Sequence, residues 1–339
     1  MMFKSAILGC GGRAKGHARA YEHVRKTKLE AVCDMDESRL APFVEEFGVP
    51  RGYRDLHEML ETEKPDLLHI VTQPHLRVEL LTLAHEHNVP AVIVEKPLAL
   101  DADDFNAIAE LSKTTATKIC VNHQLRYHPK LLELLADVED GKIGEVKFID
   151  ASSRLNLAGQ GTHVLNLVFA FNGAVRPDLV FGNACGKSQL DSHHAAPDMA
   201  VAQVNFPNRV RCLLACGLNA VATCDDERNS RHKRIAVYGA SGFVHWQMHA
   251  WERATTDVAY ESGEKEYGDE DVLGQAAMTD AMIDWLEDDS KVHANCLDTS
   301  LAETNTVLGL YASAINGTSV ELPYEPKEGL LDGLRAKPE

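Results

Sequence analysis

The sequence predicts an α/β protein with two domains: a doubly wound parallel sheet first, then an α+β domain with an open-faced, mostly antiparallel sheet. Strand-like and helix-like segments alternate over the first 124 residues, a pattern typical of parallel sheets. Strand-like segments joined by hairpin turns follow. A chain of 339 residues can also bury two separate cores. We therefore expect domains at residues 1–124 and 125–339.

In the first domain, apolar runs predict strands and the segments between them predict helices. Residues 67–71 and 91–94 are almost continuously apolar, as strands buried on both faces should be. Asp36 and Asp101 occupy helix N-cap positions. The predicted strands are 3–8, 29–33, 66–71, 90–94 and 118–122, and the predicted helices are 14–25, 37–47, 55–62, 75–87 and 101–115. Right-handed crossovers between such units give a parallel sheet that binds ligands beyond its carboxyl edge.

The pattern changes near residue 130, where a predicted helix, 129–140, ends at Gly141. Residues 205–209 predict a turn between two strands. The predicted strands are 145–151, 179–185, 199–206, 209–217, 234–238 and 242–249, and further helices are predicted at 162–171, 272–287 and 298–315. This order predicts a mostly antiparallel sheet with helices on one side.

The composition is that of an ordinary globular protein, with 45% hydrophobic and 25% charged residues. No apolar run reaches the roughly 18 residues that a membrane span needs, and the run at 3–8 is too short for a signal peptide. The net charge of −17 argues against nucleic-acid or membrane partners. The eight cysteines form no C-x-x-C pair, which favours reduced thiols in a cytoplasmic protein.

A glycine-rich turn between the first predicted strand and helix has the spacing G-x-G-x-x-A. Its residues are Gly9, Cys10, Gly11, Gly12, Arg13 and Ala14. Such a turn brings backbone amides at a helix N-terminus close to a pyrophosphate. The second predicted strand ends in Asp34, about 20 residues further on, where an acid binds the ribose hydroxyls. The sequence therefore predicts a Rossmann domain that binds a dinucleotide.

The predicted cofactor is NAD, with NADP the less favoured alternative, because Asp34 would repel a 2′-phosphate. Arg39 lies close enough to contact that phosphate, although its place in the next helix favours a structural role. A Glu95-Lys96-Pro97 triplet follows the strand that ends at Val94. A lysine at a strand end is by default a surface residue, but here it would point into the nicotinamide cleft. Pro97 predicts a tight turn, for which a cis bond is one geometry.

These motifs resemble the Gfo/Idh/MocA family, which includes glucose–fructose oxidoreductase and inositol dehydrogenase. The resemblance covers nearly the whole chain. It includes residues 9–14, 71–75, 95–97, 122–129, 141–146, 161–166 and 311–323. It implies a pyridine-nucleotide domain, a sheet domain, and a sugar or polyol as substrate. It makes Lys96 the active-site lysine and His163 the catalytic histidine. The remaining implied cofactor contacts are Thr72, Pro74, His75, Glu95, Lys96 and Pro97.

One departure concerns the acids that many family members carry around the histidine. Gly159 and Asn166 stand at those two positions. A carboxylate would orient the ring and stabilise its charged form. Without one, His163 could be a base with a pKa near the reference value of about 6.5, a hydrogen-bond donor or a structural histidine.

Further substrate contacts are expected from Arg126, Tyr127, His193 and His194, although Arg126 is equally suited to an interdomain ion pair. Asp191, His193, His194 and Asp198 also suggest a metal site. Adjacent histidines on a strand point to opposite faces, so they cannot both bind one ion. We therefore expect no metal.

The sequence thus predicts an NAD(P)-dependent oxidoreductase that moves a hydride from a carbinol carbon to nicotinamide. One alternative keeps the cofactor but oxidises transiently, as a lyase or glycosidase. The other is a ligand-sensing regulator without catalysis, against which Lys96 and His163 argue. Because the open sheet face needs cover, a homodimer or homotetramer is expected.

Overall fold

The computed structural model describes residues 2–327 and 329–337. The chain divides into two compact units. The first unit contains residues 1–98, 107–128 and 268–300, and the second contains 99–106, 129–267 and 301–339. The boundaries predicted for two domains, 1–124 and 125–339, remain a prediction. Among the described residues, no helix has both the length and the apolar character needed to cross a membrane.

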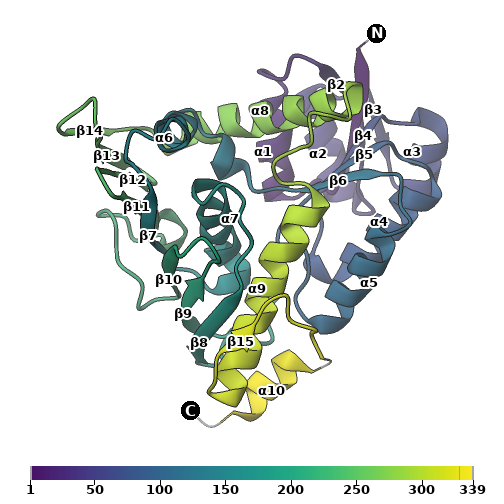
Figure 1. The fold of residues 1–339 in the computed structure, drawn as a ribbon. Coiled ribbons are helices and arrows are strands. Elements are labelled where there is room, and N and C mark those ends of the chain that lie inside the picture. Colours follow the sequence, from purple (N-terminus) through teal and green to yellow (C-terminus); the bar gives the residue numbers. More distant parts are fainter. Residues whose placement is uncertain (1, 328, 338–339) are drawn as a thin grey trace. The chain divides into compact units, whose positions relative to one another are not determined.

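The first unit contains a six-stranded, wholly parallel sheet with the order β3-β2-β1-β4-β5-β6. Figure 1 labels five of these strands, β2 to β6. The strands of this sheet are β1 (Phe3–Leu8), β2 (Thr27–Cys33), β3 (Arg51–Tyr53), β4 (Leu67–Ile70), β5 (Ala91–Val94) and β6 (Lys118–Val121). This is the order of a Rossmann fold, so the predicted class is confirmed. The three-residue β3 was not predicted.

Helices follow the strands in the order expected for crossover connections. They are α1 (Gly12–Ala20), α2 (Glu37–Phe47), α3 (Leu56–Glu63), α4 (Arg77–Glu86) and α5 (Ala102–Ser112), and α8 (Tyr267–Glu287) comes much later. Helix α1 is shorter than predicted and ends at Ala20. Apolar residues of α8, including Met278 and Met282, pack on Leu67 and Ile93 of the parallel sheet. This helix was expected in the second domain, but it covers part of the first sheet.

The second unit contains a nine-stranded sheet in which only β7 and β10 pair in parallel. Its strands are β7 (Val146–Ser153), β8 (Leu179–Cys185), β9 (Met199–Asn205), β10 (Arg211–Cys216), β11 (Lys233–Gly239), β12 (Phe243–Gln247), β13 (Ala250–Ala254), β14 (Glu261–Glu264) and β15 (Val320–Glu321). The mostly antiparallel prediction is confirmed. The strand predicted at 242–249 corresponds to β12, which ends at Gln247, and the chain then turns into β13, which was not predicted.

Helices in this unit are α6 (Pro129–Glu139), α7 (Thr162–Phe171), α9 (Leu297–Asn316, from residue 301 on) and α10 (Leu330–Ala336). Every residue of α7 from His163 to Phe171 is buried. Helix α9 lies against β8, where a Cβ on Gly182 would approach Leu310 to 2.8 Å. The buried face of the sheet therefore rests on helices, as predicted.

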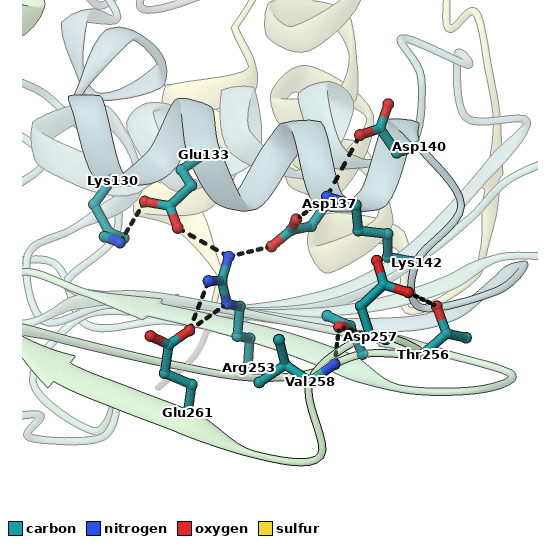
Figure 2. Close-up of polar contacts among 11 residues, drawn as sticks. Lys130, Glu133, Asp137, Asp140, Lys142, Arg253, Thr256, Asp257, Val258 and Glu261 are labelled. Carbon is teal, nitrogen blue, oxygen red and sulfur yellow. Dashed lines mark hydrogen bonds and ion pairs between the residues drawn. The ribbon is translucent and has the colours of Figure 1, made fainter.

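A cluster of charged side chains connects α6 to β13 and β14 (Figure 2). The guanidinium of Arg253 lies 2.7 Å from Asp137, 2.9 Å from Glu133 and 2.6 Å from Glu261. Lys142 also donates to Asp137, at 2.9 Å. The Asp137 and Arg253 side chains are only 6% and 16% exposed. Burial alone would raise the pKa of Asp137, but hydrogen bonds from Lys142 and Arg253 hold it below its ordinary value.

Candidate active site

The glycine loop between β1 and α1 has the backbone shape that its motif predicts. Gly9 has a φ of +96°, and a Cβ there would lie 2.4 Å from the carbonyl oxygen of Val71. Apart from neighbouring residues of the chain and the backbone of α1, no described atom lies within 4 Å of the Cβ positions of Gly11 and Gly12, and no described side chain caps the first turn of α1. A helix N-terminus of this kind attracts anions. The loop therefore fits the pyrophosphate of a dinucleotide.

Asp34 follows β2 and is 7% exposed. Its carboxylate accepts hydrogen bonds from the backbone amides of Cys10, at 2.8 Å, and Asp36, at 2.9 Å. The Arg39 guanidinium donates to the same carboxylate, at 2.9 Å. Asp34 is thus fixed beside the glycine loop, where an acid would meet a ribose. The contact also brings Arg39, from α2, to this position.

Lys96 lies two residues after the end of β5, and its bond to Pro97 is cis, the geometry that the sequence offered for this turn. The lysine is half-buried. Burial lowers its pKa to about 8, the charge of Glu95 opposes that shift, and Arg13 and Arg77 reinforce it. An amine with this pKa changes protonation state near neutral pH, as a general acid or base must.

Glu95 is buried and bound by three donors on one carboxylate oxygen. Arg13 Nε and His17 Nε2 each lie 2.9 Å from Oε1, and Asn122 Nδ2 lies 2.6 Å from it. Burial would raise the pKa of Glu95, but Arg13 and His17 hold it well below its usual value. The carboxylate is therefore ionised, and Glu95 directly precedes Lys96 in the sequence.

Sequence analysis missed His17 and Asn122, although two signals pointed to them. His17 is four residues after Arg13, which places both on one helix face. Asn122 follows β6, at the carboxyl edge where α/β proteins bind ligands. It also missed two residues of α8: Gln275 accepts from Arg13 at 3.0 Å, and Asp271 lies 3.6 Å from Arg13. No local pattern could have connected residues so far apart in sequence.

The other residues predicted in the first unit differ in their surroundings. Thr72 follows β4, and its hydroxyl is buried with no hydrogen-bond partner among the described residues. Pro74 is buried and His75 exposed, both in a short 3₁₀ turn. Arg126 donates to the carbonyl of residue 294 at 3.4 Å, and the Tyr127 hydroxyl lies 3.2 Å from His293 Nε2. Tyr127 also packs against the apolar cluster under α8.

In the second unit, His163 is the second residue of α7 and is 5% exposed. A π-helical turn, Leu157–Gly161, leads into that helix. Asn156 caps this turn by accepting the backbone N–H of Gly159 at 2.6 Å. A Cβ on Gly159 would lie 2.7 Å from the same Asn156 oxygen. The family's aspartate at position 159 would therefore displace this cap, which accounts for the glycine.

The other departure, Asn166, is fully buried. Its Nδ2 donates to Glu303 Oε1 at 2.8 Å, and Glu303 is 3% exposed on α9. Asn166 lies three residues after His163, so both share one face of α7. A carboxylate thus reaches this face from α9. Sequence analysis missed it because 137 positions separate Glu303 from Asn166.

The segment around His193 and His194 lies near the cap of the π-helical turn. Asn156 Nδ2 donates to the carbonyl oxygen of His194 at 3.2 Å. The His193 side chain is exposed and that of His194 half-buried. Asp198 accepts from the backbone and hydroxyl groups of residues 188 and 189. Within the described part of the chain, no group of three His, Cys, Asp or Glu residues could hold a metal ion.

Comparison with known proteins places this geometry in a class of pyridine-nucleotide proteins. Residues 3–123 match the model of an oxidoreductase family with an NAD-binding Rossmann fold, the Gfo/Idh/MocA family. A D-apiose dehydrogenase of Paraburkholderia graminis is 27% identical over 63% of this chain and 60% of its own length. A myo-inositol 2-dehydrogenase of Thermotoga maritima is 27% identical over 44% of each chain. The chain thus spans about half the length of these curated relatives.

Solved structures extend the likeness of the fold to almost the whole chain. An oxidoreductase from Agrobacterium radiobacter, solved with NAD⁺, L-tartaric acid and magnesium, has a TM-score of 0.80. It is 19% identical and covers 95% of this chain and 98% of its own. The fold and the glycine loop define an NAD-binding Rossmann protein. Over residues 3–123, the chain matches the Gfo/Idh/MocA oxidoreductase family.

Proposed function

We propose that the protein is an NAD-dependent oxidoreductase that oxidises a carbinol carbon of a sugar, a polyol or a derivative, in the cytoplasm. The half-buried Lys96, with a pKa near 8 at the end of β5, is the observation that carries this proposal. The glycine loop and Asp34 would hold the cofactor. When bound, NAD accepts the hydride from the substrate carbon. The dehydrogenases among the relatives support the substrate class.

In this proposal Lys96 takes the proton of the substrate hydroxyl, because its neutral form is accessible near pH 8. Glu95 opposes a further fall in the basicity of Lys96. His163 is the second proposed catalytic residue. Thr72, Pro74 and His75 contribute to the cofactor site. Arg126, Tyr127, His193 and His194 are proposed substrate contacts.

A substrate panel tests the proposed reaction. The purified protein is mixed with excess NAD and single sugars or polyols, including apiose and myo-inositol. Absorbance of the reduced nicotinamide is followed together with product mass. We expect at least one member to give stoichiometric reduced cofactor and a product two hydrogens lighter. A ligand that binds tightly without any chemical change would favour the regulator instead.

We predict tighter binding of NAD than of NADP, because the Asp34 side chain would repel a 2′-phosphate. Replacing Asp34 by Asn removes that charge and leaves the Arg39 guanidinium to meet the phosphate. We expect this variant to shift the ratio of the two dissociation constants toward NADP by about tenfold or more. Fluorescence titrations with both cofactors measure the ratio, and Asp36→Asn is the control. Tighter NADP binding by the unaltered protein would contradict the assignment.

We also propose that the protein is a homo-oligomer, formed through the sheet face opposite the helices. Large apolar side chains of four strands are exposed there: Phe181, Val201, Leu213 and Tyr238 are 42–55% exposed. Their neighbours along each strand, such as Val180 and Leu214, are buried. An apolar face of this kind is covered in most stable proteins, and a second copy would cover it with the same residues.

Light scattering at micromolar concentration tests this proposal. We expect a dimer or tetramer that dissociates when Val201 and Leu213 are both replaced by Glu. In a two-fold interface the same face of both copies meets, so the introduced negative charges would repel one another. Val292→Glu changes an equally exposed valine in the first unit and should leave the mass unchanged. A monomeric unaltered protein would overturn the proposal.

A further inference from the structure

A chain of buried polar side chains extends from Glu95 into the interior of the first unit. His17 Nε2 lies 2.9 Å from Glu95 Oε1, and His17 Nδ1 lies 3.1 Å from His69 Nδ1. On the far side of that ring, His69 Nε2 lies 2.8 Å from the hydroxyl of Tyr21. His17 and His69 are 1% and 0% exposed, and Tyr21 is half-buried. The chain thus begins at a partly exposed phenol and ends on a buried carboxylate.

The partners leave one arrangement of protons for this chain. Glu95 is ionised and can only accept, so His17 carries its proton on Nε2, and the Asn122 amide 3.2 Å from that nitrogen donates to Glu95 instead. Burial lowers the pKa of His17 and of His69, so both rings are neutral, with one protonated nitrogen each. His17 Nδ1 is therefore an acceptor and His69 Nδ1 the donor to it. His69 Nε2 in turn accepts from the Tyr21 hydroxyl, so every donor in the chain points toward Glu95.

We propose that Tyr21, His69 and His17 are positioning residues, which keep Glu95 ionised and fixed in place so that its negative charge acts on Lys96. The proposal rests on the proposed function, because it assigns the three residues to the acid–base chemistry of Lys96. His17 makes the direct contact with the carboxylate. His69 and Tyr21 act through it, because they fix which nitrogen of His17 carries the proton.

Other charged and titratable groups face the two acid–base residues. Arg13 of α1 lies against Glu95, and Asp271 of α8 lies beside Arg13. The charge of Arg77, at the start of α4, lowers the pKa of Lys96. The charge of Lys96 in turn lowers the pKa of His123, which follows β6. None of these groups belongs to the hydrogen-bonded chain. Changes confined to Tyr21 and His69 therefore leave these other charges in place.

Loss of the hydrogen bonds between Tyr21, His69 and His17 should lower the pKa of Lys96. Without His69, His17 Nδ1 loses its donor and only Glu95 still favours the Nε2–H form, so the hydrogen bond from His17 to Glu95 weakens. The carboxylate stays ionised between Arg13 and Asn122 but is held less firmly in place, so its charge acts less strongly on Lys96. Burial and the charges of Arg13 and Arg77 then lower the pKa of Lys96 below its value of about 8. The acid limb of the kcat/KM profile should move to lower pH.

Nuclear magnetic resonance tests the proposed protonation of His17 and His69 independently of catalysis. Protein labelled with ¹⁵N-histidine gives the protonation of each ring nitrogen from long-range ¹H–¹⁵N spectra, with His17→Gln and His69→Gln for assignment. We expect His17 protonated on Nε2, His69 protonated on Nδ1, and neither ring titrating between pH 6 and 8. A His69 ring protonated on Nε2, or either ring titrating in that range, would overturn the proposal.

Kinetics test the effect on Lys96. In His69→Phe we expect the acid limb of kcat/KM to move down by about half a pH unit or more. Tyr21→Phe, which removes a single oxygen, should shift it less in the same direction. His57→Phe is the control, because His57 and His87 form an exposed pair at 3.0 Å. An unmoved limb in both Tyr21→Phe and His69→Phe would overturn the proposal. An unaltered protein without any such limb would contradict the proposed function. The protonation of the two histidine rings would then be the only test of the proposed hydrogen-bonded arrangement.

Discussion

Replacing Lys96 by Met is expected to lower turnover by about 10²–10⁴-fold, the effect of losing a general acid–base group. Methionine retains the length and apolar stem of the side chain but cannot carry a proton. The fold and the glycine loop are untouched, so NAD affinity should change little. Steady-state kinetics and a separate NAD titration measure the two quantities.

The pH profile adds a second expectation for the same variant. Because the pKa of Lys96 is about 8, oxidation by the unaltered protein should rise with pH as the amine loses its proton and level off above pH 8. The Lys96→Met profile should lack this rise. Lys113→Met is a matched control, since Lys113 is an exposed lysine paired with Glu110. Full turnover by Lys96→Met would mean that the triplet is only a structural turn.

Replacing Arg253 by Met should cost about 3 kcal/mol of unfolding free energy, because it removes one of the two cations that pair with the buried Asp137 carboxylate. Lys142 still donates to Asp137 in the variant, which keeps the expected cost at the lower end for a broken buried pair. Urea unfolding at neutral pH, followed by circular dichroism, measures the change.

The sign of the pH dependence follows from the lowered pKa of Asp137. A carboxyl group with a lowered folded-state pKa stabilises the fold above its unfolded pKa of about 3.9, and this contribution is lost as pH falls through the folded value. The difference between Arg253→Met and the unaltered protein should therefore shrink in acid. Arg228→Met breaks a surface pair with Asp226 and should change stability far less, because surface ion pairs contribute little. An equally small effect of Arg253→Met would show that the cluster in Figure 2 contributes little.

Much of the fold could be predicted because its signals are local. The runs at 67–71 and 91–94 are apolar enough to mark strands buried on both faces, and the alternation with helices fixed their parallel order. The short β3, β13 and β14 were missed, because strands of three to five residues with charged side chains at a sheet edge have no clear periodicity. The packing of α8 on the first sheet was missed for a different reason: a helix face shows that it is apolar, but not which sheet it covers.

The residues of the candidate site also differ in whether local sequence signals reveal them. Gly9, Asp34 and Lys96 lie in motifs whose spacing within the sequence carries the chemistry. Gln275, Asp271 and Glu303 enter only through tertiary contacts, which sequence spacing does not encode. The substitution at Gly159 was visible in the sequence, but its reason, the Asn156 cap, depends on an atomic distance.

Transfer of deuterium tests the central claim most directly. A substrate found in the panel is labelled with deuterium at the carbon to be oxidised and incubated with protein and excess NAD, and both product and cofactor are analysed by mass. We predict one deuterium in the reduced cofactor for each molecule of oxidised product. A cleaved or dehydrated product with no net reduced cofactor would contradict net oxidation and favour the transient mechanism.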